Sequence, residues 1–155
     1  TINETEGLPD AFKNSRLGEM YFLRALFYFE GIRVFGPYLP WVDDTFTEND
    51  PKVHNDIDIY PKVLADIDQA IALLPATQPE VGRANSWAAK ALKAKVLMQR
   101  GDLAAAKPIL KDVIDNGVTS NNLKYGLEND MDRNFYSPTD NGKESVFAIV
   151  RKNRR

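Results

Sequence analysis

Hydrophobic positions divide the chain into four helical stretches, separated by polar or proline-rich connections. The first and most apolar stretch covers residues 15–36, with Ser15 as a suitable N-cap and Gly36 able to adopt the left-handed conformation that ends helices. Most of its charged residues fall on one narrow stripe of the helical wheel: Arg16, Glu19, Glu30 and Arg33. Because a helix that is apolar nearly all round is buried among other elements, we expect this stretch to lie in the centre of the core.

Charges within this stretch set two further expectations. Four charged residues between Glu19 and Arg33 argue against a membrane span, which needs roughly 20 residues with few charges. Arg24 stands apart from the polar stripe, on the apolar side of the helix. A guanidinium there needs a partner or a route to solvent, and the sequence does not identify the carboxylate that pairs with it.

Apolar spacing predicts three further helices, over residues 57–74, 86–100 and 103–115. A short turn of helix is also expected at 10–13, ahead of the first long helix. Each of the three begins near a side chain able to cap it: Asp56 or Asp58, Ser86, and Asp102.

The last two of these helices match the tetratricopeptide pattern around the Gly101-Asp102 turn. Small residues let the two helices cross closely, and larger ones fill the gaps beside them: Ala94 and Ala106, with Leu97 and Leu110. Lys90 stands where an aromatic residue is usual. A weaker copy of the pattern joins the first two helices, with 36–56 inserted in its turn. We therefore expect hairpins at about 15–75 and 86–116, followed by a loop-rich region over 117–155.

Residues 144–150 (ESVFAIV) alternate and are rich in β-formers, so they predict one strand. A single strand is not stable alone, so its partner is expected outside this sequence. Together with a start at Thr1 inside a polar segment, this indicates a fragment of a longer protein, forming a single domain. The predicted fold is all-α: tetratricopeptide-like hairpins, a long inserted loop and a minor strand near the C-terminus.

Composition excludes several functions. The 155 residues carry a net charge of −2, so no basic excess points to nucleic acid. The absence of cysteine excludes disulfides, thiolate metal sites and a cysteine nucleophile. His54, the only histidine, lacks a second ligand and is expected on a surface loop, and Trp87 is expected in the core. Because no phosphate loop, nucleophile elbow or zinc motif is present, we expect no catalytic residue, no metal and no cofactor.

The connection at 36–56 is the strongest candidate for a binding site, because connections longer than about 12–15 residues are often functional. Tyr38, Trp41, Asp43 and Asp44 combine aromatic faces with carboxylates, a mixture that suits the faces and hydroxyls of a pyranose. Alternatively, Tyr38 and Trp41 pack the insertion onto the helices. Asp43 and Asp44 are unsuitable as a pair of calcium ligands, because adjacent side chains rarely converge on one ion and no EF-hand spacing follows.

Four segments resemble, in order, those of the SusD/RagB-type nutrient-binding lipoproteins of Bacteroidetes. They are 19–42 (EMYFLRALFYFEGIRVFGPYLPWV), 65–76 (ADIDQAIALLPA), 82–115 (GRANSWAAKALKAKVLMQRGDLAAAKPILKDVID) and 141–150 (NGKESVFAIV). The resemblance implies an α-helical surface protein with tetratricopeptide-like units, tethered by lipid to the outer membrane beside a SusC-like TonB-dependent transporter. Such proteins capture glycans or other nutrients and are not enzymes. The lipidated cysteine through which they meet the membrane is absent from this chain.

The resemblance therefore predicts a non-catalytic glycan-binding or nutrient-binding lipoprotein that works with a TonB-dependent transporter in polysaccharide uptake. An intracellular tetratricopeptide adaptor, gripping a peptide or protein in its concave face, is the first alternative. A glycan-processing enzyme is the second, and the lack of a convincing pair of acid and base carboxylates counts against it.

Overall fold

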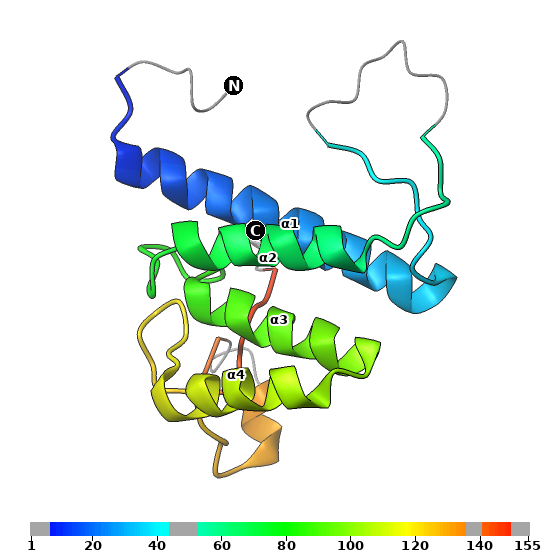
Figure 1. Ribbon diagram of the computed structural model, residues 1–155. Helices are drawn as coiled ribbons and strands as arrows, with labels where there is room; N and C mark the ends of the chain where they lie inside the picture. The colour runs from blue at the N-terminus through cyan, green and yellow to red at the C-terminus, as the bar shows by residue number, and fades with distance from the viewer. Residues whose placement is uncertain (1–6, 44–52, 136–140, 150–155) are drawn as a thin grey trace, which may run out of the picture.

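The computed structural model describes residues 7–43, 53–135 and 141–149. These residues form four α-helices, α1 (Asp10–Phe35), α2 (Tyr60–Leu73), α3 (Ser86–Arg100) and α4 (Leu103–Asn116), and a short 3-10 helix, η2 (Met131–Phe135). Figure 1 shows the four α-helices stacked in chain order, with α2 antiparallel to α1 and α4 antiparallel to α3. The structure thus confirms the all-α class and the helical hairpins.

Helix α1 begins earlier than the sequence analysis predicts. Ser15, the expected N-cap, lies inside the helix, and Pro9 occupies the N-cap position with φ −58° and ψ 140°. The Pro9 carbonyl accepts hydrogen bonds from the backbone N–H groups of Phe12 and Lys13, at 3.0 and 3.1 Å. The turn expected at 10–13 therefore continues into the long helix, because nothing between Asp10 and Ser15 interrupts helical geometry.

The expectation that α1 is buried nearly all round is wrong. One face is buried, through Gly18, Phe22, Ala25, Phe29 and Ile32. The opposite face leaves large apolar side chains more than 60% exposed: Met20, Phe27, Val34 and Phe35. The reason is that α1 lies at one end of the stack, so that α2 and α3 contact it from one side only (Figure 1).

The other helix boundaries depend on local caps. Helix α2 begins at Tyr60 rather than at residue 57, because Asp58 accepts a hydrogen bond from the Tyr60 N–H at 2.9 Å and Pro61 occupies the first turn. Asn85, not Ser86, caps α3 by accepting from the Ala88 N–H at 2.8 Å.

Helix α4 is capped as predicted. The Asp102 carboxylate accepts from the Ala105 N–H at 3.1 Å, and the helix runs one residue beyond the predicted end, to Asn116. Gly101 ends α3 at φ 89°, the left-handed conformation that makes the two-residue turn possible.

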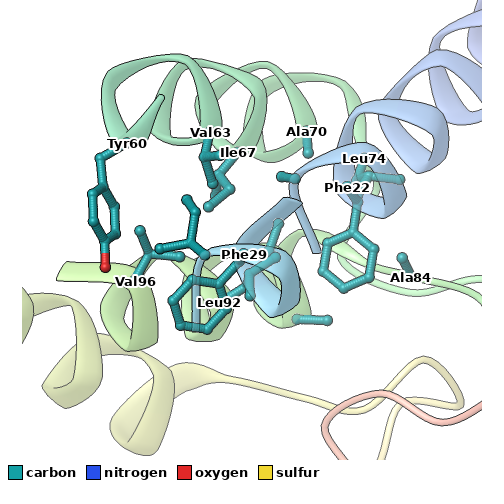
Figure 2. Close-up of a cluster of buried hydrophobic side chains, with 14 of the residues drawn as sticks. Phe22, Phe29, Tyr60, Val63, Ile67, Ala70, Leu74, Ala84, Leu92 and Val96 are labelled. Atoms are coloured by element: carbon teal, nitrogen blue, oxygen red, sulfur yellow. The ribbon is translucent and has the colours of Figure 1, made fainter. Parts of the chain in front are cut away.

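The main core lies between α1, α2 and α3, where side chains from the three helices converge (Figure 2). Its largest members are at most 2% exposed: Phe22, Phe29, Ile59, Ile67, Val63 and Val96. A second cluster joins α3 to α4 through Ala94, Leu97 and Ala106, with Leu110 packed against it. This is the arrangement that the tetratricopeptide pattern predicts.

The strand predicted at 144–150 does not form over its described residues, 144–149. No partner strand pairs with it in the described part of the chain, so the segment is irregular, while Val150 lies outside the described residues. Its central side chain is nevertheless anchored, because Phe147 packs edge-to-face on Phe22 with ring centroids 4.9 Å apart and planes at 70°. β-forming residues here contribute to packing instead of to a sheet.

Candidate functional site

The segment that follows α1 is held at both of its ends. Gly36 ends the helix at φ 87° and donates its N–H to the Ile32 carbonyl at 2.9 Å. The Pro37 carbonyl accepts from the Ile59 N–H at 3.1 Å, and Leu39 packs against the main core. These contacts carry residues 37–43 across the beginning of α2.

Trp41 lies half-buried at the junction of this segment with α1. Its ring stacks on Tyr28, with centroids 4.5 Å apart and planes at 29°. The indole Nε1–H donates to the Asp43 carboxylate at 3.0 Å, and the Tyr28 hydroxyl accepts from the Val42 N–H at 2.8 Å. The indole thus has the polar partner that a half-buried tryptophan needs, and these contacts hold the Trp41 ring in place.

Arg24 finds its partner on α2. Its Nε and Nη2 donate to the two oxygens of Asp66, at 2.6 and 2.7 Å, a bidentate ion pair between two helices. The hydrogen bond to Asp66 raises the pKa of Arg24 against the effect of burial, and the charges of Asp66 and Asp43 raise it further. Arg24 therefore stays fully protonated beside an aromatic pair.

Two cations lie over the Trp41 ring. The Arg24 guanidinium carbon is 5.0 Å from the ring centroid, and the Lys62 Nζ is 5.5 Å from it. The Arg24 guanidinium also lies 5.5 Å from the centroid of Tyr21. Both distances to Trp41 fall within the range of cation–π attraction.

The structure brings together two of the four predicted site residues. Trp41 and Asp43 are hydrogen-bonded, whereas Tyr38 is 56% exposed and Asp44 lies outside the described residues. Sequence reasoning did not place Arg24 or Lys62 at this site. The position of Arg24 on the apolar side of its helix was the available signal, since a charge there needs a nearby partner.

The arrangement offers an aromatic surface, a carboxylate and two cations within one small region. Such groups can contact the apolar face of a sugar and its hydroxyls. Within the described residues, no group of three or more His, Cys, Asp and Glu side chains could hold a metal ion. In the same part of the chain, no helix has the length and apolarity that crossing a membrane requires.

Two other residues singled out by the sequence lie elsewhere. His54 is exposed in the connection before α2, as expected. Trp87, expected in the core, is only partly buried in the first turn of α3, with the Lys90 Nζ 4.2 Å from its ring centroid. Lys90 replaces the usual aromatic of the repeat and pairs with Asp112 at 2.7 Å, which keeps this side of α3 polar.

Stacked antiparallel helices of this kind define a tetratricopeptide-like helical protein, and comparison with known families is more specific. The SusD-like family model described as "Starch-binding associating with outer membrane" matches residues 1–98. The chain belongs to this SusD-like family, which is associated with the outer membrane. A SusD-like protein of Bacteroides ovatus is 28% identical over 160 residues, which cover 94% of this chain and 28% of that protein.

Solved structures of SusD-type proteins share the fold of this chain. A SusD superfamily protein from Bacteroides vulgatus is 25% identical with a TM-score of 0.76, covering 94% of this chain and 30% of that one. NanU from B. fragilis is 25% identical with a TM-score of 0.75, covering 98% and 31%. Surface glycan-binding protein A from Bacteroides thetaiotaomicron, solved with laminarihexaose, is 18% identical with a TM-score of 0.72, covering 94% and 30%, a likeness that shows the fold alone. The chain spans less than a third of the length of these relatives.

Proposed function

We propose that this chain belongs to a glycan-binding lipoprotein at the bacterial surface that works with a TonB-dependent transporter in polysaccharide uptake and is not itself an enzyme. Membership of the SusD-like family supports this proposal, because the family is described as starch-binding and outer-membrane-associated. The same membership favours it over an intracellular tetratricopeptide adaptor. The helices would hold the binding surface against the transporter.

Within this chain, the proposed sugar contacts are Tyr38, Trp41, Asp43 and Asp44. The observation that carries this assignment is the Trp41–Asp43 pair, an indole edge bonded to a carboxylate at 3.0 Å in a segment held against two helices. An aromatic ring that is fixed in place loses little conformational entropy when a ligand binds. Tyr38, which is more than half exposed, supplies a second ring without rearrangement.

Affinity electrophoresis tests this assignment. The full-length protein is run through native gels with and without soluble starch or laminarin. Laminarin is a polymer related to the laminarihexaose in the structure of surface glycan-binding protein A. We expect the polysaccharide to retard the wild type, Trp41→Ala to lose retardation, and Trp87→Ala, the matched control on α3, to keep it. Retardation of Trp41→Ala equal to that of the wild type would show that the site lies elsewhere.

The same material tests the absence of catalysis. Wild type and Asp43→Asn are incubated with each polysaccharide, and newly formed reducing ends are measured. We expect no release above buffer from either protein. Release by the wild type that Asp43→Asn abolishes would assign an enzymatic role to the carboxylate and overturn the proposal.

A further inference from the structure

Arg24 connects three parts of the molecule. It lies on α1, forms the bidentate ion pair with Asp66 on α2, and places its guanidinium 5.0 Å from the Trp41 ring centroid in the segment between these helices. Asp66 is only 5% exposed, so its carboxylate depends on Arg24 for charge compensation. The ion pair therefore fixes the guanidinium as firmly as it fixes the two helices.

Trp41 depends on side-chain contacts for its position. Residues 37–43 form neither helix nor strand, so no regular pattern of backbone hydrogen bonds fixes the segment that carries the indole. Its described contacts are the stack on Tyr28, the bond to Asp43 and the two cations, Arg24 and Lys62. Among these, Arg24 is the one locked by two hydrogen bonds to a buried group.

We propose that Arg24, held by Asp66, is a positioning residue that fixes the Trp41 ring for sugar contact. This inference rests on the proposed function for its purpose, but not for its geometry. A planar guanidinium bound through two N–H groups cannot rotate, so it presents one face to its neighbours, whereas a lysine ammonium at the same position would lack both the plane and the fork. The charge alone is therefore insufficient, and Lys62 cannot replace it.

Fluorine NMR of protein labelled with fluorotryptophan tests this role. The Trp41 resonance is assigned by its loss in Trp41→Phe, and Trp87 serves as an internal reference. In Arg24→Lys, which keeps the charge, we expect the Trp41 resonance to shift and its H2O-to-D2O isotope effect to increase, because the ring becomes more exposed. The Trp87 resonance should stay in place.

A double variant separates positioning from stability. Arg24→Met with Asp66→Leu removes both charges, so it leaves no unpaired ion in the core and should fold with a melting temperature close to that of the wild type. We expect the same increase in the H2O-to-D2O isotope effect at Trp41 as in Arg24→Lys, because this readout follows the exposure of the ring and not the nearby charge. Arg33→Gln is the matched control, because this arginine lies on the same helix in an exposed pair with Glu30; it should move neither resonance.

Glycan affinity gives the functional readout. Loss of one cation–π contact corresponds to about two- to fivefold weaker binding of laminarin or starch by the double variant, which no longer has a cation at position 24. An unchanged isotope effect at Trp41 in the folded double variant would overturn the positioning role, even if Trp41→Ala abolishes binding. An increased isotope effect in a protein whose wild type binds neither polysaccharide would instead support the positioning role and refute the proposed function.

Discussion

Gly18 on α1 packs directly against the C-terminal end of α2, and this contact predicts the effect of a single methyl group. A Cβ added at Gly18 would lie 2.8 Å from Leu74 Cγ, 3.1 Å from Leu73 Cβ and 3.1 Å from Leu74 Cδ2. Leu73 Cβ is attached to the helix backbone and Leu74 is 6% exposed, so neither can move freely. Overpacking of this kind costs about 1–3 kcal/mol, whereas Ala in a helix interior gains about 1 kcal/mol over Gly.

Gly18→Ala should therefore lower the free energy of unfolding by about 1 kcal/mol. Gly31→Ala is the matched control in the same helix, because its Cβ would meet only the terminal Leu39 Cδ1, at 3.0 Å. That methyl group can rotate away at a small cost, so the control should keep most of the gain from helix propensity and become more stable by about 0.5–1 kcal/mol. Urea unfolding followed by circular dichroism measures both. A Gly18→Ala protein as stable as Gly31→Ala would refute the close approach of α1 and α2.

Two further predictions concern buried polar groups. Asn85→Ala should lower the free energy of unfolding, measured in urea, by about 2–3 kcal/mol. The substitution removes the cap of α3 and the donor to the carbonyls of Ala76 and Val118, at 2.8 and 2.9 Å. A loss no larger than that of an ordinary surface substitution would contradict this role of Asn85. Burial raises the pKa of Tyr125 to about 12, and its hydroxyl has no hydrogen-bond partner among the described residues. The contribution of Tyr125 to stability is therefore present below the unfolded pKa of about 10 and is lost as the pH rises toward 12. Tyr125→Phe should therefore lose less stability at alkaline pH than the wild type. In an absorbance titration of this variant, one late-ionising tyrosine should be missing.

Local signals explain what the sequence predicts correctly. The α3–α4 hairpin depends on small residues close in the chain, Ala94 and Ala106, and on a turn whose Gly101 has φ 89°. Both the packing pattern and the turn lie within one short segment, so spacing alone determines them. Trp41 and Asp43 lie together for a similar local reason, since a single position separates them, and their contact with sugar stays a prediction.

Tertiary contacts explain what the sequence does not predict. Asp66 is 42 positions from Arg24, and other carboxylates on the first two helices, such as Glu19, Glu30 and Asp68, could have served as well by sequence alone. The half-exposure of α1 depends on how many helices cover it, which periodicity does not report. The absence of a strand at 144–149 has the same origin, because pairing requires a second segment in the right place.

We propose that the segment after α1 forms a sugar-binding surface that includes Trp41. Titration of fluorotryptophan-labelled full-length protein with laminarihexaose, and separately with a maltooligosaccharide, tests it most directly. We expect at least one of these ligands to shift the Trp41 resonance in a saturable manner and to leave the Trp87 resonance unchanged. Saturable binding that moves Trp87 or neither of these two resonances would contradict it.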